Sequence, residues 1–356
     1  MSEKTMLAAV YHGPGDLRVE KYPVPAIGPD EALVRVTSAC ICGTDMRILH
    51  GGHRKFPSGT VRIPGHEVVG EIAQVGSEVV GLAVGQRVFV APNMGCGHCR
   101  QCVTGNNNLC ADYQAVGITL DGGFAEYMRI PAAAIAQGNV MPIANAVDPA
   151  VAALTEPFAC VLRGQDAVDI GPGDVVVVVG VGPIGAMHIL LARLRGAGRI
   201  IASDMNCDRL AMAPGFGADR VVDPDHEDLV QAVEGETGGR GADVVIVAAP
   251  AHAAQEQALR VAGLGGRINF FGGLPKDRPA IAFDSNLVHY KELRVTGTTA
   301  CSTSDCWRGA AIVNSGRVDL ARLVQARYPL DRIDEAFAAA GGRTALKVVV
   351  EPCGAS

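Results

Sequence analysis

The stretch "DVVVVVGVGPIG" constrains the fold more than any other part of this chain. An apolar strand leads directly into Gly180, Gly182 and Gly185, spaced G-x-G-x-x-G, and a helical stretch follows. The three glycines permit a tight turn, a close backbone approach to a pyrophosphate, and close packing of the helix on the strand. The stretch therefore predicts a dinucleotide-binding loop that includes Pro183 and Ile184, with a purely structural glycine turn or a flavin site as the alternatives.

The region after the loop alternates helices and strands. A helix "PIGAMHILLARLRGAG" is followed by a strand "RIIASD", a further helix, and strands in "ADVVIVAAP", "GGRINFFGG" and "ELRVTGT". This alternation is typical of a parallel sheet with right-handed crossovers. We predict an α/β, doubly wound nucleotide domain over residues 153–293. It is inserted into a β-rich domain formed by residues 1–152 and 294–356, where short apolar runs alternate with Gly and Pro.

Asp204 ends the second strand of this region, twenty-four residues after Gly180. A carboxylate there can accept hydrogen bonds from the adenosine ribose hydroxyls and would repel a 2'-phosphate, so it favours NAD over NADP. The alternative is a solvated acid with no cofactor contact. Arg209, in the helical stretch that follows, is the other residue of this segment that we predict to bind the cofactor.

Four cysteines lie in the fifteen residues "CGHCRQCVTGNNNLC". Cys96, Cys99, Cys102 and Cys110 have the spacing C-x2-C-x2-C-x7-C, and neighbouring glycines allow the chain to wrap around one centre. Four thiolates close a tetrahedral zinc site and leave no open position, which predicts a structural role. Disulfides are disfavoured by the short spacings, and an iron–sulfur cluster, the alternative on ligand type, usually has different spacings.

The overall composition excludes several classes of protein. The formal net charge of −6 argues against a nucleic-acid surface, which needs clustered Lys and Arg. The start "MSEKTMLAAVYHG" lacks the basic and apolar parts of a signal peptide, and the longest apolar run is too short and too glycine-broken to span a bilayer. We expect a cytoplasmic protein that has no membrane or nucleic-acid partner. Its eleven cysteines would then be thiols or metal ligands.

A second set of potential metal ligands is spread along the chain. "ACICGTDMR" supplies Cys42, "PGHEVVGE" supplies His66 and Glu67, and "LTEPFAC" supplies Glu156. A catalytic zinc site needs three protein ligands and an open position. Each residue alone could equally be structural, as a buried thiol, a turn histidine or an acid at a helix start. The residue types by themselves leave both interpretations open.

The motifs "CGTD", "GHE", "GGFAEY", the four cysteines, "TEP", "GVGPIG" and "ALKVVVEP" occur in one order along nearly the whole chain. With them the chain resembles the zinc-containing medium-chain alcohol dehydrogenases, most closely their polyol and threonine dehydrogenase branch. The resemblance implies a Rossmann domain inserted in a GroES-like, β-rich catalytic domain. It also implies oxidation of a secondary alcohol of a polyol or sugar to a ketone, with NAD as hydride acceptor. A threonine or amino-alcohol dehydrogenase and a non-catalytic nucleotide-binding protein are the alternatives.

The same resemblance implies two zinc ions per chain. Cys42 and His66 would be ligands of the catalytic zinc. Either Glu67 or Glu156 would be the third ligand, and the other carboxylate would contact the metal-bound water or exchange with it. The four cysteines of the "CGHCRQCVTGNNNLC" segment would hold the structural zinc.

The resemblance also assigns supporting roles. Thr44 would take the proton of the alcohol and pass it on through the nicotinamide ribose, and Asp45 would orient the zinc-binding histidine. Arg47 stands where relatives often have a histidine late in the proton path. It could instead contact a cofactor phosphate, or His50 or His53 could substitute for the histidine, and the alternative is that all three are solvated loop residues. The strand "GGRINFFGG" resembles the family's dimer edge. We therefore expect a homo-oligomer, a tetramer in preference to a dimer.

Overall fold

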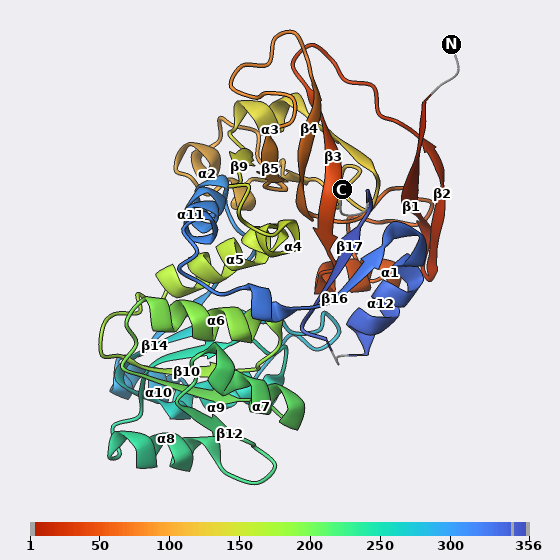
Figure 1. Cartoon of the computed structure of the whole chain (residues 1–356). Helices are drawn as coiled ribbons and strands as arrows, with labels where there is room; N and C mark the ends of the chain where they lie inside the picture. The colour runs from red at the N-terminus through yellow and green to blue at the C-terminus, as the bar shows by residue number, and fades with distance from the viewer. Residues whose placement is uncertain (1–3, 343–344, 354–356) are drawn as a thin grey trace. The chain divides into compact units, whose positions relative to one another are not determined.

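A computed structural model describes residues 4–342 and 345–353 of the chain (Figure 1). The chain divides into two compact units. The β-rich unit consists of Met1–Ala159 together with Cys301–Ser356, and the nucleotide unit consists of Cys160–Ala300. The second unit is thus inserted into the first, which is the arrangement that the sequence predicts.

The two boundaries fall later than the expected positions 152 and 293. The first lies after Ala159, inside helix α5, Thr155–Asp166. The second lies after Ala300 because β15, Arg294–Gly297, still pairs with the parallel sheet of the nucleotide unit. The sequence predicts a strand in "ELRVTGT" as part of the alternating region, but the expected boundary at 293 left this strand outside the nucleotide domain.

The nucleotide unit is built on one parallel sheet of six strands in the order β12-β11-β10-β13-β14-β15. The chain starts at a central strand, moves outward to one edge, and then returns to build the other half, as in doubly wound nucleotide-binding folds. The "VVVVV" run is the central strand, and valine suits it because both of its faces are covered. The strands are β10 Val175–Val179, β11 Arg199–Ser203, β12 Arg220–Val222, β13 Ala242–Val247, β14 Ala262–Phe270 and β15 Arg294–Gly297.

One expectation about this sheet is wrong. The segment "GGRINFFGG" belongs to β14, which lies between β13 and β15 and is therefore an inner strand. The edge strand is β15, because Arg294 and the residues after it pair in parallel with Arg267 and its successors. Helices α6 and α7 pack together, as do α8 and α9 (Figure 1). The helices are α6 Pro183–Leu194, α7 Cys207–Phe216, α8 Leu229–Thr237, α9 His252–Val261 and α10 Ser285–Lys291.

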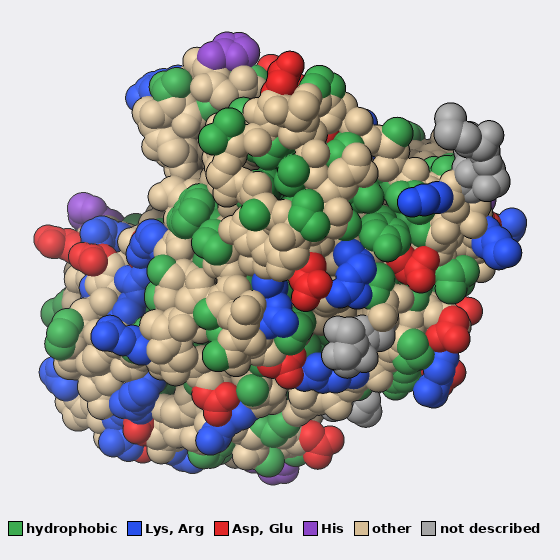
Figure 2. Space-filling model, turned by 45° about the horizontal axis from the view of Figure 1, so that its top comes forward, with side chains coloured by type: hydrophobic (Ala, Val, Ile, Leu, Met, Phe, Trp, Pro, Cys, Tyr) green, Lys and Arg blue, Asp and Glu red, His purple; other side chains and the backbone are tan. Residues whose placement is uncertain are grey.

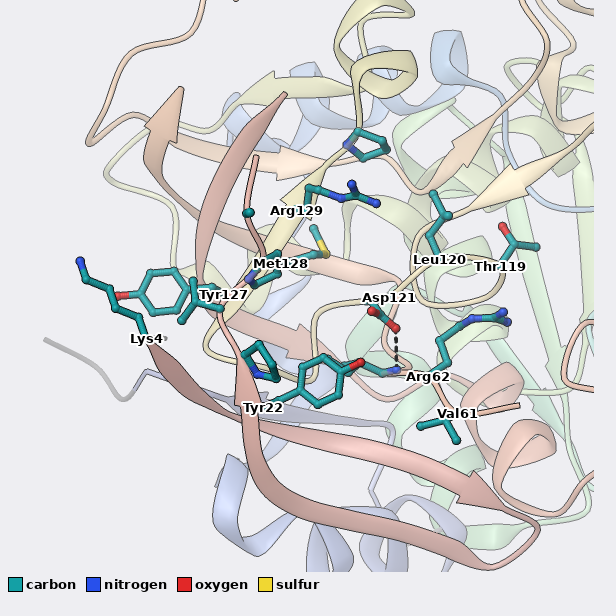
Figure 3. A pocket seen from close by; sticks show the side chains of 17 residues that line it. Lys4, Tyr22, Val61, Arg62, Thr119, Leu120, Asp121, Tyr127, Met128 and Arg129 are labelled. Carbon is teal, nitrogen blue, oxygen red and sulfur yellow. Dashed lines mark hydrogen bonds between the residues drawn. The ribbon is translucent and has the colours of Figure 1, made fainter. Parts of the chain in front are cut away.

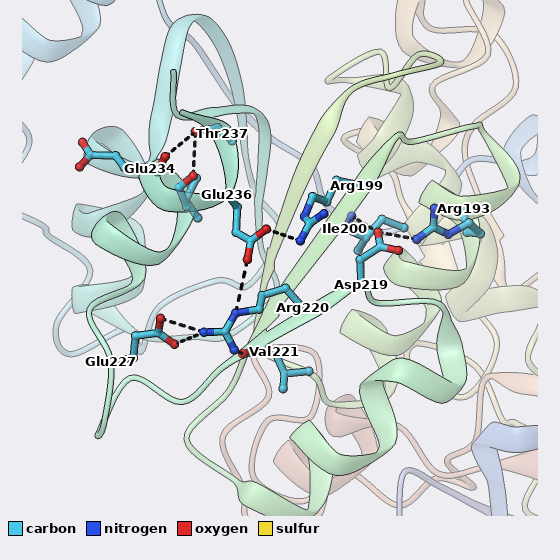
Figure 4. Close-up of polar contacts among 11 residues, drawn as sticks. Arg193, Arg199, Ile200, Asp219, Arg220, Val221, Glu227, Glu234, Glu236 and Thr237 are labelled. Carbon is cyan, nitrogen blue, oxygen red and sulfur yellow. Dashed lines mark hydrogen bonds and ion pairs between the residues drawn. The ribbon is translucent and has the colours of Figure 1, made fainter. Parts of the chain in front are cut away.

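Ion pairs join β11, β12 and the helices beside them (Figure 4). Arg220 contacts Glu227 at 2.6 Å and Glu236 at 3.7 Å, and Arg199 also pairs with Glu236. The side chains in this network are partly exposed, so each pair contributes about 1 kcal/mol or less to stability. Their main effect is to fix α8 and the loops at this end of the sheet.

The β-rich unit is centred on strand β3, which pairs with β4, β8 and the C-terminal strand β17. The return of β17 to this sheet confirms the expectation that "ALKVVVEP" rejoins the first domain. Two further pairs, β1 with β2 and β6 with β7, complete the strands. The bounds are β1 Thr5–Gly13, β2 Asp16–Pro23, β3 Ala32–Cys40, β4 Glu67–Val75, β5 Arg87–Val90, β6 Asn93–Met94, β7 Gln114–Ala115, β8 Tyr127–Ile130, β9 Val140–Pro142, β16 Val324–Pro329 and β17 Lys347–Glu351.

Short helices connect these strands. Helix α1 begins directly after Cys42, and α12 packs on β16 and β17. The helices of this unit are α1 Gly43–Leu49, α2 Arg100–Val103, α3 Ala132–Ala136, α4 Pro149–Ala153, α11 Thr303–Asn314 and α12 Ile333–Gly341, with 3-10 turns η1 Asn107–Leu109, η2 Ala321–Leu323 and η3 Leu330–Arg332.

Candidate active site and metal centres

The four cysteines predicted to bind structural zinc lie together in the β-rich unit. Their ligand atoms are all within 4.8 Å of one another. The Sγ atom of Cys99 lies 3.6 Å from that of Cys102 and 3.8 Å from that of Cys110. Four sulfurs held about 2.3 Å from a zinc ion in tetrahedral geometry are roughly 3.8 Å apart. The cluster therefore has the size of a zinc–tetrathiolate site.

The electrostatics of this cluster also favour a bound cation. Backbone amides of His98 and Cys99 hold the pKa of the Cys96 thiol down at about 6. Burial, together with the neighbouring sulfurs, raises the pKa of the Cys102 thiol to about 12. One thiolate is therefore stabilised by the backbone, but further thiolates beside it are costly unless a positive ion neutralises them.

The second predicted cluster forms around the start of α1 and the start of β4. Cys42 precedes the first residue of α1, and His66 precedes Glu67, the first residue of β4. Their ligand atoms lie within 4.8 Å of one another. His66 and Glu67 are buried. The structure thus brings together three of the four residues that the sequence proposed for the catalytic zinc.

Asp45, in the first turn of α1, lies next to both His66 and Cys42. Its Oδ1 is 3.4 Å from His66 Nδ1, while its Oδ2 accepts a hydrogen bond of 2.9 Å from the backbone N–H of Cys42. Burial disfavours a charged imidazole, but Asp45 and then Cys42 outweigh it and raise the pKa of His66 well above its usual value. A cation bound to the imidazole would satisfy the same negative environment, so the residues fit a metal-binding histidine that is oriented by a carboxylate.

Lys347 is a site residue that the sequence interpretation missed. Its Nζ lies 2.7 Å and 2.5 Å from the two carboxylate oxygens of Glu67 and 3.2 Å from the carbonyl oxygen of Ile41. Burial disfavours the ammonium form, yet the charge of Glu67 and the thiols of Cys40 and Cys42 raise the pKa of Lys347. A single lysine inside the apolar strand "ALKVVVEP" was the available signal, since such a residue needs a buried partner.

Glu156 lies in the first turn of α5 and is also buried. Its Oε1 is 3.7 Å from the Sγ of Cys301, which comes just before helix α11. Among the described residues, the ligand atoms of Cys42, His66 and Glu67 lie within 4.8 Å of one another, and Glu156 is not part of this cluster. The structure therefore separates the two candidate carboxylates into different surroundings, one paired with an ammonium and one beside a thiol.

Thr44 lies on α1 about one turn before Arg47, while His50 follows the end of the helix and His53 lies beyond it. Arg47 Nη2 donates a hydrogen bond of 3.1 Å to Thr44 Oγ1. His50 Nδ1 lies 2.6 Å from the carbonyl oxygen of Met46, at the end of the same helix. Arg47 therefore contacts Thr44 directly, whereas His50 is held by the backbone.

The glycine loop of the nucleotide unit has the three features that the sequence predicts. Gly180 has a φ of +95°, and a Cβ there would lie 2.9 Å from the backbone nitrogen of Ala249. A Cβ on Gly185 would lie 1.8 Å from the carbonyl oxygen of Gly180, so only glycine lets α6 approach this closely. A Cβ on Gly182, which precedes α6, would meet only the guanidinium of Arg209, at 3.6 Å. Pro183 and Ile184 follow as the first residues of α6.

Asp204 lies beside this loop at the end of β11. Its Oδ2 accepts a hydrogen bond of 2.6 Å from the backbone N–H of Val181, and its Oδ1 accepts one of 2.9 Å from Asn206. Each carboxylate oxygen keeps a further lone pair for a ribose hydroxyl. The buried Nε of Arg209 has no hydrogen-bond partner among the described residues. The loop, the acid and the arginine are therefore the groups that could hold an adenosine ribose and a pyrophosphate.

A hollow of about 990 Å³ on the β-rich unit lies elsewhere (Figure 3). Its lining includes Tyr22, Tyr127 and Arg129, and Asp121 accepts a hydrogen bond of 3.0 Å from the backbone N–H of Ile63 at its wall. None of the described residues that line it is a predicted metal ligand or cofactor contact. The size of this hollow therefore does not identify it as the reactive centre. The candidate reactive centre is identified instead by the metal-ligand atoms of Cys42, His66 and Glu67.

Basic and acidic side chains are mixed on one face of the protein (Figure 2). On the face shown in Figure 2, acidic side chains lie among the basic ones, so that face has no continuous basic surface of the kind that nucleic-acid binding requires. In the part of the chain that the structure covers, no helix has both the length and the apolar character that a membrane crossing would need.

Two known protein families match this chain, each over a different stretch of it. Residues 28–142 match the family described as alcohol dehydrogenase GroES-like domain, and residues 183–315 match the family described as zinc-binding dehydrogenase. An L-threonine 3-dehydrogenase of Bacillus velezensis is 33% identical over 323 residues, which cover 90% of each chain. A sorbitol dehydrogenase of Bacillus subtilis is 33% identical over 360 residues, which cover 98% of each chain.

A solved structure shows the same architecture. A Sinorhizobium meliloti 1021 protein described as a zinc-binding dehydrogenase, solved with NADP bound, superimposes with a TM-score of 0.91 at 34% identity. The match covers 98% of this chain and 100% of the other. The similarity therefore extends over both units and over both predicted metal clusters.

Proposed function

Because the chain belongs to the zinc-binding alcohol dehydrogenase family, we propose that it oxidises a secondary alcohol of a polyol or sugar to a ketone and passes the hydride to NAD. Membership makes it an oxidoreductase with a GroES-like and a Rossmann-like domain. The observation that supports a working enzyme is the convergence of Cys42, His66 and Glu67 within 4.8 Å, with Asp45 next to the histidine. A non-catalytic nucleotide-binding protein has no need for this arrangement of ligands.

Cys42, His66 and Glu67 are the residues that we propose to hold the catalytic zinc. Each oxygen of Glu67 has two lone pairs, so its contacts with Lys347 leave the carboxylate able to bind a metal. Glu156 is the proposed second carboxylate, which would contact the metal-bound water or exchange with it. The four cysteines at 96, 99, 102 and 110 are proposed to hold the structural zinc.

Zinc, when bound, acts as a Lewis acid that makes an alcohol or water at the site much easier to deprotonate. The chain must then carry the proton away, and Thr44 is proposed to do so. Arg47 donates to one lone pair of Thr44 Oγ1, which leaves the second lone pair to accept the alcohol proton and the O–H to pass a proton on. Arg47 itself stays protonated and cannot act as a base.

NAD is the proposed cofactor in preference to NADP. The support for it is Asp204, whose negative charge lies next to the glycine loop and would repel a 2'-phosphate. The similar S. meliloti protein was solved with NADP, so the preference is a testable property of this chain. Gly180, Gly182, Pro183, Ile184 and Gly185 would then cradle the pyrophosphate; Arg209 would lie beside it.

Threonine or another amino alcohol is the second candidate substrate, since a 33% identical relative is an L-threonine 3-dehydrogenase. The test is the initial rate of NAD reduction with polyols, sugars, threonine and simple secondary alcohols, before and after removal of zinc by a chelator. Turnover of a polyol that disappears on chelation and returns with zinc supports the proposal. Turnover of threonine alone would replace the substrate class, and turnover that survives removal of all zinc would refute the catalytic role of the cluster.

We also propose that the protein is a cytoplasmic homo-oligomer, with a tetramer preferred. The support is the free edge of β15 and the exposed apolar side chains in the same half of the nucleotide unit, Leu264, Phe283 and Tyr290. The eleven cysteines all lie among the described residues and form no disulfide there, which suits a reducing compartment. Sedimentation equilibrium of the purified chain measures the oligomeric state.

A further inference from the structure

A buried polar network connects the four-cysteine lobe (residues 96–110) to the loop that contacts Glu156. Asn107, inside the lobe, donates a hydrogen bond of 2.9 Å from Nδ2 to the carbonyl oxygen of Asn93. Its Oδ1 accepts one of 2.9 Å from the backbone N–H of Thr303. Asn107 is buried, and both ends of its amide are thus engaged with segments outside the lobe.

Asn93 continues the network to Cys301. Its Nδ2 donates to the carbonyl oxygen of Cys301 at 2.8 Å and lies 3.6 Å from the Cys301 sulfur. Its Oδ1 accepts a hydrogen bond of 2.6 Å from the hydroxyl of Tyr113. The amide orientation is therefore fixed, because the tyrosine hydroxyl supplies a donor to one end and the carbonyl of Cys301 an acceptor to the other.

The segment held in this way is the one that lies against Glu156. The Cys301 thiol is 3.7 Å from Glu156 Oε1, and both residues are buried. Ala300, the residue before it, has a φ of +52°, in the left-handed region that alanine rarely adopts. Such a conformation persists only where surrounding contacts impose it, and the two asparagines supply such contacts on the next residues of the loop.

We propose that Asn107 and Asn93 are positioning residues that hold the Cys301–Thr303 loop against Glu156 and so couple the four-cysteine lobe to the reacting centre. The inference rests on the proposed function in one respect, the role of Glu156. Among the described residues, the cysteines of the lobe form a ligand cluster separate from that of Cys42, His66 and Glu67. Its effect on catalysis passes through Asn107 to Thr303 and through Asn93 to Cys301.

The test compares two substitutions at Asn107 in the zinc-loaded enzyme. Asn107→Ala removes both hydrogen bonds, whereas Asn107→Asp keeps an acceptor for the N–H of Thr303. Asn106→Ala is the matched control, because Asn106 lies next in the lobe but is only half-buried and its side chain bonds to Thr104, inside the lobe. Zinc content is measured first and should remain two per chain in all three variants.

The first readout is amide hydrogen exchange of the peptide that contains Cys301–Thr303. We expect exchange at Thr303 to be at least tenfold faster in Asn107→Ala and close to that of the unmodified protein in Asn107→Asp and Asn106→Ala. The second readout is steady-state kinetics, in which Asn107→Ala should lower kcat five- to tenfold and change KM less than twofold. In a Glu156→Gln background the same substitution should lower kcat no further.

Each other outcome has a definite meaning. Unchanged exchange at Thr303 in Asn107→Ala overturns the anchoring of the loop. Faster exchange with unchanged kcat, where Glu156→Gln does lower kcat, overturns the step from the loop to Glu156. If Glu156→Gln leaves kcat unchanged, the proposed role of Glu156 is overturned, while faster exchange in Asn107→Ala still supports the anchoring.

Discussion

Lys347 Nζ lies 2.7 Å and 2.5 Å from the two carboxylate oxygens of Glu67, and both side chains are buried. Glu67 is itself one of the three proposed ligands of the catalytic metal, because its ligand atom lies within 4.8 Å of those of Cys42 and His66. A buried carboxylate whose cationic partner is removed is strongly destabilising. A bound zinc ion offers the same carboxylate a second positive charge, so stability and metal binding should be linked through Glu67.

Replacement of Lys347 by Met should therefore lower the stability of the zinc-free protein by about 3–5 kcal/mol and that of the zinc-loaded protein by less. The measurement is the thermal midpoint of each variant with and without chelator. Lys347→Met with Glu67→Gln is the matched control and should recover most of the stability of the zinc-free form, because no unpaired charge remains. An equal loss with and without zinc would show that Glu67 does not bind the metal.

Replacement of Thr44 by Val should lower kcat by about 100-fold, because the side chain keeps its shape but can no longer carry a proton. Thr44→Ser, which retains the hydroxyl, should keep most of the activity. The comparison is made by steady-state NAD reduction at saturating alcohol. Arg47→Ala serves as the control for the 3.1 Å contact to Thr44 and should change kcat by less than tenfold. Full activity in Thr44→Val would assign the proton path to another group.

Replacement of Asp204 by Asn should weaken the discrimination against NADP. The amide can still accept the hydrogen bond from Val181 N–H, but it no longer repels a 2'-phosphate. We expect the ratio of kcat/KM for NAD to that for NADP to fall about 100-fold, which corresponds to about 2.7 kcal/mol. The two cofactors are compared with one alcohol at fixed ionic strength. A preference for NADP in the unmodified protein would contradict the interpretation of Asp204.

Replacement of Cys102 by Ser should remove the structural zinc alone. The Sγ of Cys102 lies 3.6 Å from that of Cys99 inside the cluster, so its loss opens the tetrahedral site. Zinc content should fall from two ions per chain to one, with a lower thermal midpoint, because the lobe loses its cross-link. Retention of two zinc ions per chain would show that the four sulfurs are not one metal site. Cys207→Ser, at an exposed cysteine in the other unit, is the control.

Motifs whose residues lie within one short segment could be predicted from the sequence. Contacts between residues that are far apart along the chain could not. The four cysteines and the three glycines each lie within one short segment, so their spacing alone restricts the geometry. Lys347 and Glu67 are 280 positions apart, and Asn93 and Cys301 are 208 apart. No local pattern joins such residues, because they meet only when β17 pairs with β3 and when the loop before α11 returns to the β-rich unit.

The choice between Glu67 and Glu156 shows the same limit within one site. Both acids stand in short motifs, "GHE" and "TEP", so the sequence identified both as candidates. What separates them is a lysine beside one and a thiol beside the other, and these neighbours come from remote segments. The edge strand of the nucleotide sheet was misplaced for a related reason, since pairing of β15 with β14 is a long-range contact.

His188 gives a pH-dependent prediction for the nucleotide unit. It is fully buried on α6, packs edge-on against Phe271 at 4.8 Å, and its backbone carbonyl accepts a hydrogen bond from Gln165. Burial, with a smaller effect of Arg195, lowers the pKa of His188 from 6.5 to about 3. The folded state therefore binds this proton more weakly than the unfolded state. Its contribution to stability is complete above pH 6.5 and is lost as the pH falls towards 3.

At pH 5 the free energy of unfolding should be about 2 kcal/mol lower than at pH 7.5 because of His188 alone. Urea titrations at pH 7.5 and pH 5 measure it, and His188→Leu should remove that part of the pH dependence while keeping the backbone contact to Gln165. An identical pH dependence in both proteins would show that His188 is protonated equally in the folded and unfolded states.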